Sequence, residues 1–362
     1  MKKPIKIAAA LMSDILLAAA VIGGDYFYCY RLPHKLEAVN IQTADTNASA
    51  NGNDADGTSD NLSETVQNQA SSVNGTDTDS VNDSDDKTPW QLKFADKFSD
   101  TVVSTATEYK SPDISIELSY NSYDSGEIDT KAGFNSDFGS MISYVAADIY
   151  ISDIKCIKAD FAKDSYGTGY YDTLNGIFAE SVSNILMING DSYSNDQNRD
   201  NGTVIRNGTV YRLKTPSYET CVLYRDGSMK VFNKFTFDEK KVVSDGAWQE
   251  WNFGPSLLDE NGKAKTSFDT FTYLTHSHPR TVLGYYEPGH YCFIVVDGRQ
   301  NGYSRGMYLT ELSKLCESLG LKIAYNLDGG HCSSMILNGN TVSRPYQISS
   351  DISDAIAITE NQ

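Results

Sequence analysis

The amino-acid composition changes abruptly along the chain, and this change limits which residues can form a folded core. Residues 40–86 are mostly Asp, Asn, Ser, Thr, Gly and Ala, with ten acidic residues and no Lys or Arg, so they supply −10 of the formal net charge of −18. A segment this polar cannot bury enough apolar surface to offset the entropy lost on ordering. We therefore expect a disordered acidic linker over residues 35–89 and a folded domain over residues 90–362.

The first 34 residues have the pattern of a membrane anchor. Three lysines among the first six residues precede a mostly apolar run over residues 7–30, which is long enough to span a bilayer. Asp14 lies within this run, where a carboxylate costs roughly 2.5–3.5 kcal/mol on insertion. A cleaved signal peptide is the alternative, because residues 18–20 form an Ala-Ala-Ala run that resembles a processing site. We expect one uncleaved transmembrane helix in the cell membrane, with the folded domain outside the cytoplasm.

Charge and cysteine content exclude some classes of partner and site. No basic stripe compensates for the acidic linker, so nucleic acid is not an expected partner. The six cysteines include no CxxC pair and have no regular spacing, which argues against a zinc knuckle or a dense disulfide framework. Five of them lie in apolar stretches, which is typical of small buried hydrophobic residues. One disulfide stays open as an alternative in an exported protein.

Short alternating strands are predicted over most of the folded domain. Residues 203–212 read as a hairpin with Asn207-Gly208 in a type I′ turn, and residues 221–232 read as a second hairpin with Asp226-Gly227 as its turn. Further strands are predicted over residues 149–157, 271–274 and 335–338. The fold class expected from this pattern is α+β, with a mixed, strand-rich sheet.

One region predicts a strand, a helix and a second strand. Residues 291–296 (YCFIVV) are an unbroken apolar run typical of a strand covered on both faces. Leucines then recur at helical spacing over residues 309–319, Gly320 suits a helix C-cap, and residues 321–325 form a second apolar run. Such a β-α-β unit normally closes as a right-handed crossover with neighbouring parallel strands. The loops 297–299 and 326–330 should then meet at one edge of the sheet, where ligands bind in open α/β sheets.

The segment 326–334 (NLDGGHCSS) is open to several kinds of site. His331 and Cys332 are not expected to pair as base and nucleophile, because adjacent side chains of an extended chain point to opposite faces. A cysteine nucleophile would need a distant histidine. A metal site could use His276 and His278 with a carboxylate, and a divalent cation such as Ca²⁺ is the other candidate, although no cofactor is required.

A phosphate site agrees better with the residue types around these loops. Gly329 and Gly330 would let backbone amides approach an anion, and Ser333 would add a hydroxyl donor. Three arginines in nearby loops offer planar forks matched to phosphate oxygens: Arg280, Arg299 and Arg305.

Three carboxylates stand at the starts of loops: Asp191, Asp297 and Asp328. Glycosyl transfer uses one carboxylic acid to protonate a leaving group and a second carboxylate to activate water or attack the anomeric carbon. Asp297 and Asp328 are the pair that the expected topology favours. Which would be the acid and which the base stays open.

From about residue 185 the chain contains a series of ordered blocks: ILMINGDSY (185–193), GTVIRNG (202–208), WNFGPSLLDENGK (251–263), HPRTVLGY (278–285), VVDGRQNGYSRGMYLTEL (295–312), NLDGGHCSSM (326–335) and RPYQISSDISDAIAI (344–358). In their order and spacing these blocks resemble the phosphodiester glycosidase family. Two positions depart from the usual family pattern, which has Gly or Gln in place of His331 and Ser or Thr in place of Cys332.

The resemblance implies hydrolysis of the bond between an anomeric carbon and a phosphodiester oxygen. The implied site residues are Asn189, Asp191, His278, Arg280, Asp297, Arg299, Ser304, Arg305, Asn326, Asp328, Gly329 and Gly330. The substrate expected is a sugar-1-phosphodiester in a surface glycopolymer, with Arg280 and Arg299 holding the phosphate. The alternative is a non-catalytic module that binds an anionic glycopolymer in exopolysaccharide biosynthesis.

Overall fold

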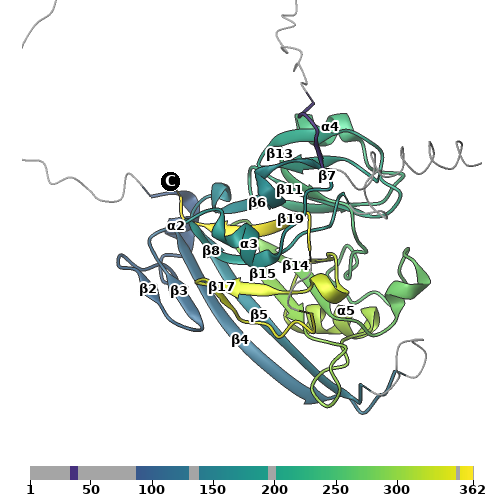
Figure 1. Cartoon of the computed structure of the whole chain (residues 1–362). Helices are drawn as coiled ribbons and strands as arrows, with labels where there is room; N and C mark the ends of the chain where they lie inside the picture. Colours follow the sequence, from purple (N-terminus) through teal and green to yellow (C-terminus); the bar gives the residue numbers. More distant parts are fainter. Residues whose placement is uncertain (1–32, 40–86, 130–137, 195–200, 348–350, 362) are drawn as a thin grey trace, which may run out of the picture. The chain divides into compact units, whose positions relative to one another are not determined.

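The structure is a computed structural model that describes residues 33–39, 87–129, 138–194, 201–347 and 351–361 (Figure 1). Nearly all of the predicted anchor, and residues 40–86 of the predicted linker, lie outside the described residues. No helix of the described part is long and apolar enough to cross a membrane. Residues at the start of that part form a short strand, β1 (His34–Lys35), which pairs with β7 (Gly167–Thr168).

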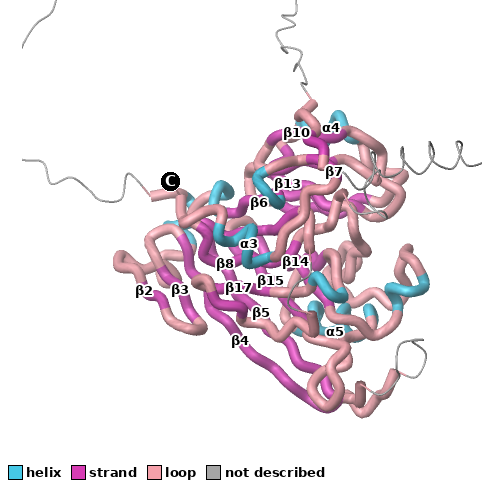
Figure 2. The backbone as a smooth tube through the Cα atoms, in the orientation of Figure 1, coloured by secondary structure: helices cyan, strands magenta, loops and turns pink. Residues whose placement is uncertain are grey.

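Two sheets form the framework of the domain, which has many strands and few helices (Figure 2). The larger sheet has the order β16-β14-β15-β5-β4-β3-β2, and the smaller has the order β18-β17-β8-β19-β6. The larger contains β2 (Val103–Ser104), β3 (Glu108–Lys110), β4 (Ile114–Asp124), β5 (Met141–Ile151), β14 (Arg280–Glu287), β15 (His290–Val296) and β16 (Ile323–Asn326). The smaller contains β6 (Ile157–Phe161), β8 (Asn184–Asn189), β17 (Met335–Leu337), β18 (Asn340–Thr341) and β19 (Asp354–Thr359). The expected strand-rich α+β class is confirmed.

Smaller elements surround this framework. Two further sheets are formed by β9 (Val204–Arg206) with β10 (Thr209–Arg212), and by β11 (Thr220–Tyr224) between β12 (Met229–Phe232) and β13 (Ala247–Trp251). The α-helices of the described part are α2 (Pro89–Lys93), α3 (Leu174–Ala179), α4 (Glu239–Ser244) and α5 (Leu309–Ser318).

The main core lies between the two large sheets. Along β15, Phe293 faces this core, whereas Ile294 packs on the opposite side of the sheet with Leu312 of α5. Along β19, Ile356 faces the main core and Ala357 packs with α3. This alternation gives four layers in the order α5, larger sheet, smaller sheet and α3, because successive strand residues point to opposite faces.

The predicted strand-helix-strand unit is present, but its two strands are not neighbours. β15, α5 and β16 form as expected, and Gly320 has the positive φ of +77° that a helix C-cap requires. However, β14 lies between β15 and β16 and pairs antiparallel with both, through Arg280 opposite Val296 and Val282 opposite Asn326. β15 and β16 therefore run parallel to each other, as expected, but the expectation that they are neighbours is wrong. Arg280, at the start of β14, lies between the ends of the two strands.

The two predicted hairpins form, with different turns. Asn207 and Gly208 have φ angles of +54° and +74°, as a type I′ turn requires. In the second hairpin Gly227 has a φ of +77°, but Asp226 is not in the left-handed region, so this turn is a longer loop.

Two of the other strand predictions are wrong. Residues 149–157 contain the end of β5, a 3₁₀ turn and the start of β6, because the Asp153 side chain accepts a hydrogen bond of 2.8 Å from the Lys155 amide and caps that turn. Residues 272–275 also form a 3₁₀ turn rather than a strand. The strand expected at residues 335–338 is confirmed as β17. The five described cysteines are buried and free, so the disulfide left open as an alternative does not form among them. Burial is what the apolar stretches predict for Cys156, Cys221, Cys292 and Cys316.

Candidate active site

A cavity of about 630 Å³ opens at the edge where β14 begins and β16 ends. Its charged lining includes two arginines, Arg280 and Arg299, and two carboxylates, Asp328 and Asp351. Four aromatic side chains, Tyr171, Phe253, Phe271 and Tyr273, line the same cavity. The volume and the mixture of aromatic walls with few charged groups suit a small polar ligand.

Arg280 is a buried cation that has no carboxylate partner in the described part of the chain. Its guanidinium donates to three carbonyl oxygens: Met307 at 3.1 Å, and Leu274 and His276 at 2.6 Å each. Burial, reinforced by the nearby Arg299, lowers the pKa of Arg280 to about 9. A buried charge without a counter-ion is costly, so an anion in this cavity would be strongly favoured.

Arg299 lies beside Arg280 and is held by neutral groups. It donates to the Tyr346 hydroxyl at 2.6 Å, to the Tyr273 hydroxyl at 3.0 Å and to His278 Nδ1 at 3.1 Å. His278 Nε2 in turn donates to the Tyr273 carbonyl at 2.9 Å, which leaves Nδ1 as the acceptor. Burial and the adjacent Arg280 lower the pKa of His278 to about 3. His278 is therefore neutral at physiological pH, and it orients Arg299.

Asp328 is one of the two carboxylates that line the cavity. It accepts hydrogen bonds from the Ser192 hydroxyl and, at 2.8 Å, from the Gly329 amide. Burial raises the pKa of Asp328, while the hydrogen bonds from Ser192, Cys332 and Gly329 oppose that rise. A carboxylate whose pKa lies nearer neutrality is suited to proton transfer.

The glycine pair contributes space rather than hydrogen-bond donors. The Gly329 amide is bound to Asp328, and the Gly330 amide donates to the Pro279 carbonyl at 3.0 Å, so neither is directed at a ligand. A Cβ atom on Gly329 would lie 2.8 Å from the Pro279 oxygen, and one on Gly330 would lie 3.2 Å from the Arg299 guanidinium. The two glycines therefore allow the loop to pack against Pro279 and leave room for Arg299.

His331 and Cys332 both line the cavity, contrary to the expectation that they face opposite ways. The reason is that residues 330–332 form a 3₁₀ turn instead of an extended chain. Burial and the neighbouring Asp328 carboxylate hold the pKa of the Cys332 thiol well above its usual range. Cys332 is therefore a neutral thiol that donates to Asp328, which does not suit a nucleophile.

Replacing Cys332 with serine should change kcat/KM only a few-fold, because a hydroxyl can donate to Asp328 in place of the thiol. Steady-state kinetics with a sugar-1-phosphate ester would measure this, and iodoacetamide should not inactivate the wild-type protein. A loss of more than about 100-fold in Cys332→Ser would indicate covalent catalysis by the thiol instead.

Asp297 does not line the main cavity. Its carboxylate accepts hydrogen bonds from the Tyr303 hydroxyl at 2.9 Å and from the Arg344 amide at 2.8 Å, and it borders a separate hollow. Ser304 is also turned away from the cavity, since its hydroxyl donates to the Asp297 carbonyl at 2.6 Å. The structure therefore does not bring Asp297 and Asp328 together in one cavity, because the start of β14 separates the two loops.

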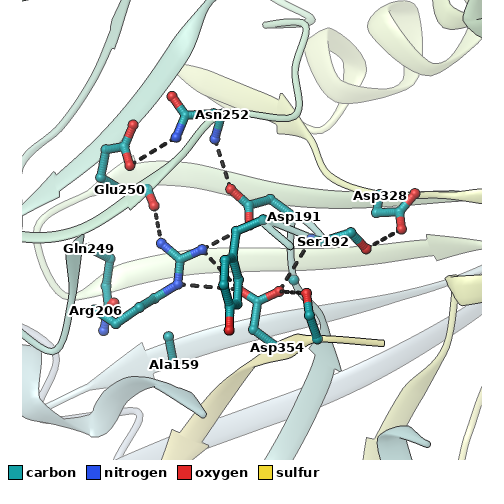
Figure 3. Close-up of polar contacts among 12 residues, drawn as sticks. Ala159, Asp191, Ser192, Arg206, Gln249, Glu250, Asn252, Asp328 and Asp354 are labelled. Carbon is teal, nitrogen blue, oxygen red and sulfur yellow. Dashed lines mark hydrogen bonds and ion pairs between the residues drawn. The ribbon is translucent and has the colours of Figure 1, made fainter. Parts of the chain in front are cut away.

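Asp191 lies behind the cavity wall in a buried ionic cluster (Figure 3). Its two carboxylate oxygens bind Arg206 at 2.8 Å and the Asn252 amide at 2.9 Å. Arg206 also binds Asp354 at 2.8 Å, and all three charged side chains are at most 1% exposed. Asp191 is placed to support the wall rather than to reach a ligand.

A third acidic residue, Glu250, completes this buried cluster. Its side chain accepts a hydrogen bond of 3.1 Å from Asn252, but the second carboxylate oxygen has no partner in the described part. Burial raises the pKa of Glu250 well above its usual value despite the nearby Arg206. Glu250 is therefore expected to hold a proton in the folded state.

Glu250→Gln should stabilise the domain more at pH 8 than at pH 4. The raised pKa means that, as pH rises through the ordinary value of 4.5, the unfolded chain ionises while the folded protein keeps its proton, so stability is lost. Glutamine removes that loss, and an increase of roughly 2–4 °C in Tm is expected at pH 8. Thermal unfolding followed by circular dichroism would measure it, with the exposed Glu260→Gln as control. An equal effect of Glu250→Gln at both pH values would contradict the account.

The remaining predicted residues lie outside the cavity lining. Asn189 holds the Asp328 carbonyl at 2.7 Å, and Asn326 donates to the Gly254 carbonyl at 2.9 Å. Arg305 is bound to Glu311 at 2.6 Å, and Ser333 is buried with a hydroxyl that has no partner among the described residues. Of the predicted set, the cavity thus gathers His278, Arg280, Arg299, Asp328, Gly329 and Gly330.

Several cavity residues had no signal in the sequence. The aromatic walls come from three segments that are far apart along the chain, around Tyr171, Phe253 and residues 271–273, so no local pattern could group all of them. Ser192 could have been noticed, because it follows Asp191 in the block ILMINGDSY. Among the described residues, no group of three or more His, Cys, Asp or Glu side chains is placed to hold a metal ion.

Comparison with known proteins identifies the family. Residues 183–359 match the family model of the phosphodiester glycosidases. An uncharacterised SPbeta prophage-derived protein of Bacillus subtilis (strain 168), YomE, is 29% identical over 218 residues, which are 57% of this chain and 32% of that protein. The match thus spans about a third of the length of that curated relative.

A solved structure shares the fold. The catalytic domain of zebrafish N-acetylglucosamine-1-phosphodiester alpha-N-acetylglucosaminidase, auto-inhibited by its pro-peptide, aligns with a TM-score of 0.51 at 17% identity. The alignment covers 69% of this chain and 89% of the zebrafish domain. The family match contains all the residues that line the cavity described above except Tyr171. Over residues 183–359 the chain belongs to the phosphodiester glycosidase family.

Proposed function

We propose that this protein hydrolyses the glycosidic bond of a sugar-1-phosphodiester in the cavity that contains Arg280, Arg299 and Asp328. The observation that carries the proposal is the pair of adjacent arginines. Arg280 is buried without a carboxylate partner in the described part, and Arg299 lines the same cavity as Asp328. A phosphate group would supply the missing negative charge, and planar guanidinium groups match phosphate oxygens.

The proposed reaction uses water and releases two products. The water oxygen forms a bond to the anomeric carbon, while the bond from that carbon to the phosphate oxygen breaks and leaves its electron pair on the phosphate. A phosphomonoester has a second pKa of about 6, so this leaving group does not need a proton at neutral pH. Arg280 and Arg299 would stabilise its developing charge. Asp328 would accept the proton of the attacking water as a general base.

The experiment that tests this function is a direct assay of both products. The full chain would be incubated with a panel of sugar-1-phosphate alkyl esters, with and without Ca²⁺, and mass spectrometry would measure free sugar and alkyl phosphate. We expect equal amounts of the two products. Saturable binding of the esters without turnover would favour the alternative, a non-catalytic glycopolymer-binding module.

The surroundings of the cavity support a polymeric substrate. A second hollow of about 280 Å³ shares His331 and Cys332 with the main cavity, and a third of about 250 Å³ shares Ser343 and Arg344 with the second. The Arg344 guanidinium lies 4.3 Å from the Tyr303 ring centre. Hollows that share walls in series, with a cation and tyrosine rings, suit an extended anionic glycopolymer.

Arg344→Gln should therefore lower kcat/KM for a phosphate-containing oligomer about fivefold to tenfold while leaving that for a short alkyl ester unchanged. The main-chain contacts of Arg344 remain in this variant, so the framework is preserved. Arg225→Gln is the matched control, because Arg225 is an exposed arginine stacked 4.9 Å from the Trp248 ring. An equal loss on both substrates would contradict the extended binding site.

We also propose that the protein acts at the outer face of a membrane. The support is the apolar run over residues 7–30 that follows three lysines, and the acidic segment that separates it from the domain. Protease treatment of intact cells should degrade the domain and leave a membrane-bound fragment. Full protection of the domain would contradict this location.

A further inference from the structure

Ser192 lies between two carboxylates, Asp354 at the start of β19 and Asp328 in the loop that follows β16 (Figure 3). Its backbone amide donates to Asp354 Oδ1 at 3.2 Å, and its hydroxyl donates to Asp328 Oδ2. Ser192 is also one of the few residues other than glycine with a positive φ, at +54°. That conformation is costly for a serine and needs support from its surroundings.

The support comes from Asp354 and from the turn that precedes Ser192. The Gly190 amide donates to the Asp354 carbonyl at 2.9 Å, and the Gly190 carbonyl accepts from the Asp328 amide at 3.3 Å. A Cβ atom on Gly190 would lie 2.6 Å from the Asp354 carboxyl carbon, so a side chain has no room there. The turn is therefore clamped between the backbones of Asp328 and Asp354.

Asp354 is itself fixed by the buried cluster. Arg206 donates to Asp354 Oδ2 through Nη2 at 2.8 Å and Nε at 3.2 Å, and shares its charge with Asp191. Burial raises the pKa of Asp354, and so does Asp191, in opposition to Arg206. Glu250 faces the same arginine with its own raised pKa. Arg206 thus neutralises the negative charge of Asp354 only in part, because it also pairs with Asp191.

We propose that Ser192 and Asp354 are positioning residues for Asp328: Asp354 holds Ser192 in its strained conformation, and the Ser192 hydroxyl orients Asp328 and favours its ionised form. This inference rests on the proposed hydrolysis, in which Asp328 acts as the base. It assigns a role to the buried cluster that neither a ligand contact nor the family match supplies.

The two residues should affect Asp328 in opposite directions. A hydroxyl that donates to a carboxylate favours the ionised form, so loss of the Ser192 hydroxyl should raise the pKa of Asp328. The negative charge of Asp354 behind Ser192 disfavours a second charge nearby, so its loss should lower that pKa. The other polar groups that face Asp328 are the Cys332 thiol, the Gly329 amide, His331 and, across the cavity, Arg299.

The test compares pH profiles of kcat/KM for wild type, Ser192→Ala and Ser192→Gly. We expect both variants to lose about 10- to 100-fold and to move the acidic limb of the profile to higher pH by about one unit. Glycine relieves the positive φ while alanine does not, so a shared shift identifies the hydroxyl as the cause. Ser194→Ala is the matched control, because that nearby buried hydroxyl has no partner in the described part. An unmoved acidic limb in both variants, or wild-type behaviour of the glycine variant alone, would overturn the inference.

The variant Asp354→Asn should shift the pKa of Asp328 in the opposite direction from the two Ser192 variants. Its side-chain oxygen can still accept from Ser192, so the acidic limb should move to lower pH. A shift to higher pH would overturn the role assigned to its charge. If this variant does not fold, the two Ser192 variants still decide the question.

A binding measurement separates this inference from the proposed function. Sulfate keeps a constant charge over the relevant pH range. Ionisation of Asp328 beside the arginines should weaken the binding of sulfate. Isothermal titration calorimetry from pH 4 to about pH 8 would locate the midpoint pH at which sulfate binding weakens. Asp328→Asn is the reference, because this variant has no carboxylate to ionise at position 328. Ser192→Ala should move the midpoint to higher pH even if no ester is hydrolysed. If the midpoint shifts but no ester is hydrolysed, only the proposed hydrolysis is rejected. If the midpoint does not shift, the positioning role is rejected.

Discussion

Arg280→Gln should lower kcat/KM for a sugar-1-phosphate ester by about 100- to 1000-fold, the cost of removing one donor from a preorganised anion site. The effect is large because Arg280 already lies buried without a counter-ion in the described part, so its charge is available to the leaving phosphate. The loss should appear in kcat as well as in KM, since the phosphate gains charge as the bond breaks. Initial-rate kinetics at several ester concentrations would measure both.

Ligand binding supplies the control for Arg280. Inorganic sulfate should raise the Tm of the wild-type protein, because a ligand that binds only the folded state stabilises it. This increase should vanish in Arg280→Gln and persist in Arg225→Gln, an exposed arginine outside the cavity. Retention of the sulfate effect in Arg280→Gln would show that Arg280 does not hold the anion.

Asp328→Asn should lower kcat by about 100- to 10,000-fold while leaving the affinity for sulfate unchanged or tighter, the range expected for loss of a general base. The asparagine oxygen can still accept from the Gly329 amide, and the asparagine NH2 group can donate to the Ser192 hydroxyl, so the loop is preserved. Burial already raises the pKa of Asp328, so the folded state resists its ionisation as pH rises above the ordinary value of 3.8. The neutral amide of asparagine removes this loss of stability, so the Tm of Asp328→Asn at neutral pH should not be lower than that of the wild type.

Asp297→Asn is the matched comparison for Asp328→Asn. Both aspartates follow strands of the larger sheet and both have pKa values raised by burial, but only Asp328 lines the main cavity. Asp297→Asn should therefore keep most of the activity on a short ester. If the two substitutions were equally damaging, Asp297 would be part of the reacting centre, and the cavity described above would be incomplete.

Local patterns in the sequence predict the elements that build this edge of the sheet. The apolar run at residues 291–296, the leucine spacing of α5 and the turn residues Asn207-Gly208 each depend on neighbours in the chain, and all three are confirmed. The grouping of Arg299 with Asp328 could also be anticipated, because both follow predicted strands. The order of strands could not, since nothing local shows that β14 inserts between β15 and β16.

The misplaced carboxylates illustrate what sequence alone does not encode. Asp191 precedes Ser192 in a promising loop, but Arg206 and the Asn252 amide reach it only after β8, β9 and the end of β13 have come together. Asp297 follows a buried strand as expected, yet the Arg344 amide and the Tyr303 hydroxyl occupy its oxygens. In both cases long-range partners decide whether a carboxylate is exposed to a ligand or committed to the framework.

Hydrolysis of a sugar-1-phosphodiester in water enriched in oxygen-18 tests the central claim most directly. If Arg280 and Arg299 bind the phosphate as a leaving group and Asp328 directs water to the anomeric carbon, the heavy oxygen should appear in the released sugar and not in the phosphomonoester. Mass spectrometry of both products, quenched before the free sugar exchanges its anomeric oxygen with water, would show this. Heavy oxygen in the phosphomonoester would mean that water attacks phosphorus, and it would contradict a glycosidase assignment for this cavity.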